Sequence, residues 1–148
     1  MSYKNAYLEL LGVPIFWVPF FSHPDSEQER ASGLLPVEIS HRKSLGLVVA
    51  APYHFAISKS KDLTLTPIIP SAEEPVLAAE YRQHIGFGQF QINASGTYTG
   101  VKDYTTGITG PKEFRGHLFA KANFQHGDNW RSSLDLNTAS DDTYLRLY

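Results

Sequence analysis

Apolar and polar residues alternate one by one through most of the chain from residue 44 onward. A period of two places every second side chain on the same face of a β-strand, whereas an amphipathic helix repeats every three to four residues. The clearest stretch is 90–99, in which Phe90, Ile92 and Tyr98 fall on one face and Gln91 on the other. The pattern predicts six strands, at 45–57, 63–69, 76–85, 90–99, 118–125 and 133–137.

Most of these strands are joined by short connections rich in Gly, Pro, Ser and Asp, which favour tight turns. They lie at 58–61, 70–75, 86–88 and 127–129. Strands joined in this way pair antiparallel, so the sequence predicts an all-β antiparallel meander. The connection at 100–116 is longer, and its Thr, Gly, Pro and Lys content predicts an exposed loop. Alternation resumes at 143–148, where we expect a further strand that stops in mid-pattern, as a C-terminal truncation would leave it.

The first forty residues differ in character. Alternation at 7–11 predicts a strand, and 13–21 predicts a second, apolar strand that its prolines confine to a sheet edge. The apolar run 10–21 is too short for a spanning helix, which needs about 20 residues, and it lacks the flanks of a secretory signal. The acidic stretch 23–33 predicts a polar linker, with a domain boundary between 22 and 44.

Two environments fit the alternation, because the apolar face can point into a soluble core or out into lipid. Strands of about ten residues suit a tilted membrane crossing. Aromatic residues near the segment ends, such as Tyr53, Tyr98 and Trp130, resemble interfacial girdles. The opposite face is charged and rich in amides, as a water-filled lumen requires. These features leave a membrane barrel and a soluble β protein both open.

Composition narrows the function. The chain has 148 residues, a formal net charge of -2 and no cysteine, which fits one domain. Because the net charge is slightly negative, the chain as a whole does not attract phosphate groups, and nucleic acid is disfavoured as a partner. Cysteine-based zinc sites, thiolate catalysis and disulfides are excluded.

No catalytic or metal-binding constellation stands out. The six histidines lack ligand-like spacing. The run Ser22-His23-Pro24-Asp25 contains the residue types of a hydrolase triad, but neighbours on an extended chain point apart, so we interpret it as a turn. Asp141 and Asp142 form a weak calcium candidate, for which a solvated turn is the competing interpretation. We therefore expect neither enzymatic activity nor a cofactor or metal.

Irregular motifs follow one another along the chain. They are GVPIFWVPFF at 12–21, HPD at 23–25, SGLLP at 32–36, PY at 52–53, DLTLTP at 62–67, EYR at 80–82 and DDTYL at 141–145. In this order, and over nearly the whole chain, they resemble the LptD family of lipopolysaccharide-assembly outer-membrane proteins. The resemblance implies a periplasmic β-jellyroll that passes lipopolysaccharide to a large barrel, from which the lipid leaves sideways between the first and last strands.

Mapped onto this chain, residues 1–22 would be the closing strands of the jellyroll and 23–43 the linker. Residues 44–148 would be the first six or so strands of the transmembrane β-barrel. If the first strand runs outward from the periplasm, alternate connections return to the periplasmic side, and the loop 100–116 is one of them. Periplasmic turns are usually short. Either the predicted number of strands or the rule of short periplasmic turns must therefore fail here. The family's disulfides have no counterpart in this cysteine-free sequence.

Two prolines interrupt predicted strands. Pro52 lies in the first and Pro67 in the second, and proline has no backbone N–H for the ladder, so pairing there is weakened. The resemblance implies that these two residues loosen a lateral gate. The alternative is that they mark a bend near the barrel rim.

Four aromatic residues of the apolar N-terminal strand form a second candidate site. Phe16, Trp17, Phe20 and Phe21 would line the jellyroll exit and contact acyl chains; an ordinary jellyroll core is the alternative. The resemblance further implies lipopolysaccharide, a plug lipoprotein of LptE type, a bridge protein of LptA type and outer-membrane lipid as partners, in a Gram-negative outer membrane. A general porin and a soluble lipid-binding β module remain alternatives.

Overall fold

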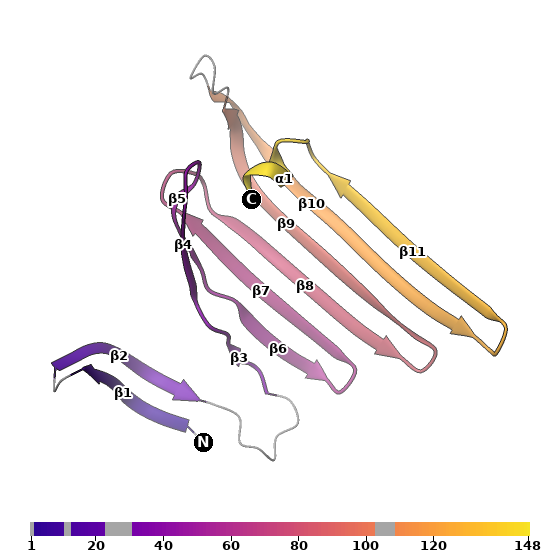
Figure 1. Cartoon of the computed structure of the whole chain (residues 1–148), viewed down its shortest axis with the longest axis horizontal. Helices are drawn as coiled ribbons and strands as arrows, with labels where there is room; N and C mark the ends of the chain where they lie inside the picture. The colour runs from indigo at the N-terminus through magenta and orange to yellow at the C-terminus, as the bar shows by residue number, and fades with distance from the viewer. Residues whose placement is uncertain (1, 11–12, 23–30, 103–108) are drawn as a thin grey trace. The chain divides into compact units, whose positions relative to one another are not determined.

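The computed structural model describes residues 2–10, 13–22, 31–102 and 109–148. The chain divides into two compact units, Met1–Gly33 and Leu34–Tyr148, and each is described by itself (Figure 1). The linker predicted at 23–43 contains the point of division between them. The assignment of the two units to a jellyroll and a barrel stays a prediction.

The first unit contains an antiparallel hairpin of β1 (Ser2–Leu10) and β2 (Val13–Ser22). The register shifts opposite Pro14, where a proline cannot donate to the ladder. Both strands predicted in this region are confirmed over the described residues.

The second unit is built on one antiparallel sheet of nine strands, in which β11, β10, β9, β8 and β7 follow one another (Figure 1). Both β5 and β6 pair with β7, β4 pairs with β5, and β3 pairs with β6. The meander predicted from the alternation is confirmed. Its strands are β3 (Gly33–Leu34), β4 (Glu38–Arg42), β5 (Gly46–Ala50), β6 (Tyr53–Ser58), β7 (Lys61–Pro70), β8 (Val76–Ile85), β9 (Gly88–Lys102), β10 (Thr109–His126) and β11 (Trp130–Ala139).

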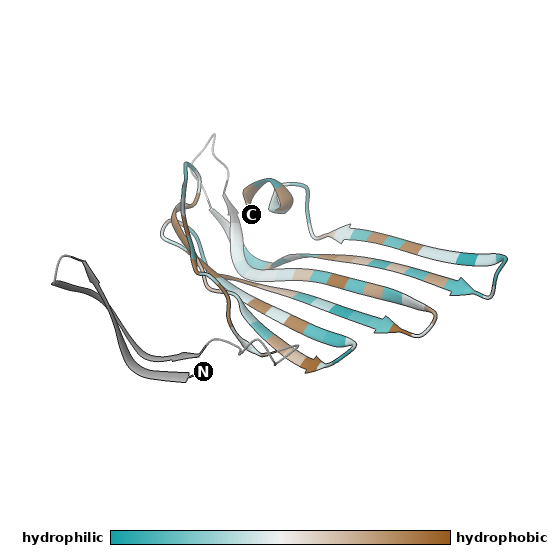
Figure 2. Ribbon diagram, turned by 60° about the horizontal axis from the view of Figure 1, so that its bottom comes forward, coloured by the Kyte–Doolittle hydropathy of each residue, from teal (hydrophilic) through white to brown (hydrophobic). Residues whose placement is uncertain are grey.

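The register gives the sheet one polar and one apolar face, and the alternation is visible along each strand (Figure 2). One row across β7 to β11 contains only polar residues: Asp62, Arg82, Gln91, Lys121 and Asp135. The next row contains only apolar and aromatic residues: Leu63, Tyr81, Ile92, Ala120 and Leu136. The five strands therefore keep the two-faced pattern that the sequence predicts.

Little of the apolar face is buried within the chain. Leu77 and Leu136 are 54% and 45% exposed. Among the described residues the hydrogen-bonded order of the sheet ends at β4 and β11, which do not pair with each other, so the sheet is not closed. An exposed apolar surface of this extent indicates a site of contact with lipid or protein.

The strand expected at 143–148 is wrong. Residues Tyr144–Leu147 form the helical turn α1 instead. The Asp141 carboxylate accepts hydrogen bonds from the backbone N–H groups of Thr143 and Tyr144, at 3.0 and 2.9 Å. Carboxylates that bind the first free N–H groups favour a helix start over an extended strand. The described residues contain no helix with the length and apolar character to cross a membrane.

The exposed loop expected at 100–116 is also wrong, because β9 continues to Lys102 and β10 begins at Thr109. Gly100 and Gly116 bring neighbouring backbones together rather than forming turns. A Cβ on Gly116 would lie 2.3 Å from the Ser95 carbonyl oxygen, and one on Gly100 would lie 2.4 Å from the Gly110 carbonyl oxygen. Of the stretch 100–116, only 103–108 lies outside the described residues.

Part of the predicted linker 23–43 is a strand, and this corrects the expectation for residues 38–42. β4 contains one apolar residue, Ile39, so it carries no period-two signal. A turn folds β5 back onto β4. Gly46, at the start of β5, has φ +70°, a conformation that favours glycine.

Candidate functional site

Pro52 and Pro67 meet at one interruption of the sheet. β5 ends at Ala50, which pairs with Ile68, and β6 begins at Tyr53, which pairs with Leu65. The register therefore places Ala51 and Pro52 opposite Pro67 and Thr66. The predicted single strand 45–57 is split into β5 and β6 at this point, which we call the proline break (residues 51, 52, 66 and 67).

Hydrogen bonding at the proline break is incomplete. The N–H of Ala51 donates to the Pro67 carbonyl oxygen at 3.2 Å. A hydrogen-bonded antiparallel pair exchanges two such bonds, but Pro67 has no N–H to return the second. The Pro52 carbonyl oxygen accepts from the N–H of Leu35, just beyond β3, at 2.8 Å rather than from β7. The prolines thus weaken the junction of β5 and β6 with β7.

The β4–β5 hairpin is held to the sheet by a short ladder. Only Val48, Val49 and Ala50 of β5 pair with β7 in register. Beyond them, the N–H groups of Ser71 and Ala72 donate to the carbonyl oxygens of Leu47 and Leu45 at 2.8 and 3.1 Å. Three registered pairs thus join the hairpin to β7, whereas eight join β7 to β8.

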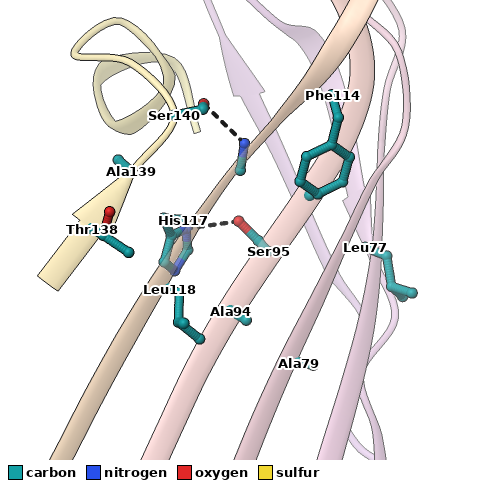
Figure 3. A pocket seen from close by; sticks show the side chains of 12 residues that line it. Leu77, Ala79, Ala94, Ser95, Phe114, His117, Leu118, Thr138, Ala139 and Ser140 are labelled. Carbon is teal, nitrogen blue, oxygen red and sulfur yellow. Dashed lines mark hydrogen bonds between the residues drawn. The ribbon is translucent and has the colours of Figure 1, made fainter. Parts of the chain in front are cut away.

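A hollow of about 640 Å³ opens on the apolar face beside Leu77, Phe114 and Leu118 (Figure 3). Its floor is made of small residues, among them Ala79 and Ala94. The Phe114 ring covers Gly96, where a Cβ would lie 2.7 Å from the ring, and Phe114 is 72% exposed. The shape and apolar lining suit a hydrocarbon chain.

On the polar face, Arg115 and Asp141 form an ion pair in which the guanidinium is buried and the carboxylate is partly exposed. The Arg115 Nε and Nη2 atoms donate to the two carboxylate oxygens at 2.8 and 2.6 Å. The Arg115 side chain is 3% exposed and that of Asp141 29%. The guanidinium lowers the pKa of Asp141 well below its usual range, with smaller contributions from Thr143 and Ser140. Asp141 thus stays ionised, neutralises a buried cation and starts α1.

Tyr144 extends this cluster onto β9. It is 0% exposed, and its hydroxyl lies 2.5 Å from the Ser95 hydroxyl. Ser95 Oγ lies 2.7 Å from His117 Nδ1 (Figure 3). His117 Nε2 lies 3.0 Å from Asn93 Oδ1. The Asn93 oxygen only accepts, so Nε2–H donates to it and Ser95 donates to Nδ1 of a neutral imidazole. Tyr144 then donates to Ser95, so that the hydrogen bonds run from Tyr144 through Ser95 and His117 to Asn93.

Sequence reasoning missed this cluster. Asp141 was considered with Asp142 as a calcium candidate, but the described residues contain no group of His, Asp and Glu side chains arranged around a metal. The available signal was Asp141 followed two residues later by Thr143, a spacing typical of a side-chain-capped turn. Its partner Arg115 could be found only once the pairing of β10 was known.

Phe16, Trp17, Phe20 and Phe21 all lie on β2, opposite Leu8, Tyr7, Lys4 and Tyr3 of β1. Their side chains lie outside the described residues, so their role as a lipid passage stays a prediction. Pro52 and Pro67 are the candidate residues that the structure does bring together.

No protein-family model matches the chain. It is similar to the LPS-assembly protein LptD of Pseudoalteromonas translucida, with 31% identity over 146 residues and 95% of this chain. It is also similar to the LptD proteins of Idiomarina loihiensis, 32% identical over 143 residues, and Paraburkholderia xenovorans, 33% identical over 143 residues, again covering 95% of this chain. The chain spans 17 to 18% of the length of these relatives.

Proposed function

The chain is homologous, over 95% of its length, to one segment of the LPS-assembly protein LptD, and from this premise we propose that it forms one side of the exit for lipopolysaccharide in an LptD-type outer-membrane barrel. The role is transport, without catalysis. The location is the outer membrane of a Gram-negative bacterium. The partners are lipopolysaccharide and membrane lipid, with a plug lipoprotein of LptE type and a periplasmic bridge protein of LptA type.

The observation that carries this proposal is the coincidence of Pro52 and Pro67 at one break of the ladder. A closed barrel satisfies every backbone group in lipid, so a bulky lipid can leave only where strands part at low cost. Missing N–H donors lower that cost at the break, since each net hydrogen bond is worth about 0.5 to 1.5 kcal/mol. The β4–β5 hairpin beside the break therefore belongs to the movable side of the lateral gate.

The two faces of the sheet support a membrane setting. The apolar rows are exposed along strands of ten or more residues, long enough for a tilted crossing. The polar rows would face a water-filled lumen, with Asp62 and Arg82 paired at 2.8 Å. A soluble lipid-binding module would need its sheet closed over the apolar face, and the described strands leave it open. A general porin would not need the proline break.

The test is lipopolysaccharide delivery by the full-length protein with Pro52→Ala and Pro67→Ala. Both changes supply an N–H at the break, so we expect delivery to slow by about tenfold at equal protein level. Pro75→Ala is the matched control, because Pro75 lies in the β7–β8 turn. Delivery at the parental rate in the double variant, or equal slowing by Pro75→Ala, would refute the gate role of the proline break.

A further inference from the structure

The apolar face is indented at the hollow beside Phe114, which spans β8, β9 and β10. Small residues, among them Ala79 and Ala94, form its floor, and the exposed side chains of Leu77, Phe114 and Leu118 stand around them (Figure 3). Its volume of about 640 Å³ is within the range of ligand pockets, about 300 to 1000 Å³. A hydrocarbon chain can therefore fill it through apolar contacts alone.

A second hollow, of about 350 Å³, lies at the end of these strands, where the β7–β8 turn meets β9 and β10. The charged side chains that line it are Glu73, Glu74 and Lys112. Lys112 and Phe114 lie two residues apart in an unbroken register on β10, so they share a face and are separated by about 7 Å. An apolar hollow and a polar hollow are thus neighbours on the sheet.

The charges of the polar hollow are accessible to a ligand. Lys112 Nζ lies 2.5 Å from Glu74 Oε1, and the two side chains are 56% and 43% exposed. Exposed ion pairs contribute little stability, so each group can exchange its partner at small cost. One ammonium and two carboxylates give the lining a net charge of -1. This charge disfavours an anionic headgroup, whereas a zwitterionic headgroup supplies a partner for both signs.

We propose that the two hollows together bind one zwitterionic phospholipid of the phosphatidylethanolamine class. An acyl chain fills the apolar hollow, the phosphate contacts Lys112, and the ammonium contacts Glu74. Leu77 pairs with Pro67 of the proline break, so this lipid lies beside the proposed exit and is not the cargo. The inference rests on the membrane setting of the proposed function, but lipid binding can be measured without any transport.

The first test is photocrosslinking of the full-length protein in vesicles of phosphatidylethanolamine and phosphatidylglycerol. One lipid at a time carries a photoreactive acyl chain, and crosslinks at Leu118, in the hollow, are compared with crosslinks at Leu134, elsewhere on the apolar face. Relative to Leu134, we expect phosphatidylethanolamine to be favoured at Leu118 by about threefold or more. The same lipid preference at both positions would overturn the proposal. So would displacement of phosphatidylethanolamine from Leu118 by an equimolar amount of lipopolysaccharide.

The second test uses two pairs of variants. Ala94→Leu fills the apolar hollow and should lower the crosslinks at Leu118 by about threefold or more, whereas Ala120→Leu, on the same face but outside the hollow, should not. Glu74→Lys should turn the preference at Leu118 toward phosphatidylglycerol, whereas Asp128→Lys, in the turn at the other end of β10, should not. Unchanged crosslinking in Ala94→Leu and Glu74→Lys, or equal effects of the two controls, would overturn the site.

Failure of this site and failure of the proposed function give different results. A protein that delivers lipopolysaccharide but shows no preference for phosphatidylethanolamine at Leu118 overturns the site and leaves the proposed function standing. A protein that shows the preference, but whose Pro52→Ala and Pro67→Ala variant delivers lipopolysaccharide at the parental rate, supports the site and refutes the gate.

Discussion

The ion pair of Arg115 and Asp141 predicts that two single substitutions lower the free energy of unfolding by unequal amounts and that their effects are strongly coupled. Asp141→Asn leaves a guanidinium that is 3% exposed without its counter-ion, and removing one partner of a buried pair costs about 3 to 5 kcal/mol. Asp141 is itself 29% exposed, so solvent screens part of this cost and we expect about 3 kcal/mol. Arg115→Met leaves a more exposed carboxylate that Ser140, Thr143 and Tyr144 still satisfy, so we expect about 2 kcal/mol.

The double variant should lose about 3 kcal/mol, less than the two single losses together, which makes the coupling about 2 kcal/mol. The assay is urea unfolding of the full-length protein in detergent micelles, followed by the shift between folded and unfolded bands on a gel. Additive single losses, with a coupling below about 0.5 kcal/mol, would refute the reasoning.

The same pair predicts a direction for the pH dependence. The pKa of Asp141 is lowered in the folded chain, chiefly by its bonds to Arg115. Its contribution to stability is therefore complete above the ordinary carboxylate pKa of about 3.9 and is lost as the pH falls below that value toward the folded one. Asp141→Asn should remove this part of the acid sensitivity, and an unchanged acid profile would contradict the assignment.

Two further substitutions test the packing and the orientation of the sheet. Gly116→Ala places a methyl group 2.3 Å from the Ser95 carbonyl oxygen and should clearly lower the midpoint of unfolding. Gly86→Ala is the control, because a methyl group there would have no atom within 4 Å, and it should change the midpoint little. Equal midpoints for the two variants would contradict the close pairing of β9 and β10. Leu136→Arg puts a charge on the apolar face and should lower the free energy of unfolding from lipid vesicles by up to about 2 to 4 kcal/mol. Asp135→Arg changes the neighbouring residue on the polar face and should lower it much less. Equal losses in the two variants would rule out the assigned faces.

The sequence predicts the strands and their faces because both depend on local information. Alternation in 76–85 and 90–99 is sufficient to place each side chain on one face, and short polar turns determine the antiparallel order. β4 could not be found in this way, since Ile39 is its only apolar residue. The glycines of 100–116 suggested a loop because a sequence does not distinguish a glycine that turns from one that allows close approach.

The candidate site was also only partly predictable from local sequence. The weakening effect of Pro52 and Pro67 follows from proline chemistry alone, but their position opposite each other depends on the register of β5, β6 and β7. The helical turn α1 could not be predicted, because Asp141, which precedes it, is bound by Arg115, a residue 26 positions away. Alternation at 145 and 147 imitated a strand, whereas the hydrogen bonds from the Thr143 and Tyr144 N–H groups to Asp141 and the burial of Tyr144 favour a helical turn.

The most direct measurement of the central claim is photocrosslinking to lipopolysaccharide from two positions on the apolar face. A photoreactive residue replaces Tyr53, beside the proline break, or Leu134, on β11 at the other end of the sheet; both are exposed, at 40% and 58%. If lipid leaves through the gate beside the first strands, lipopolysaccharide in transit is trapped from position 53 and not from position 134. Equal trapping at both positions, or none at position 53 in a protein that exports normally, would contradict the account.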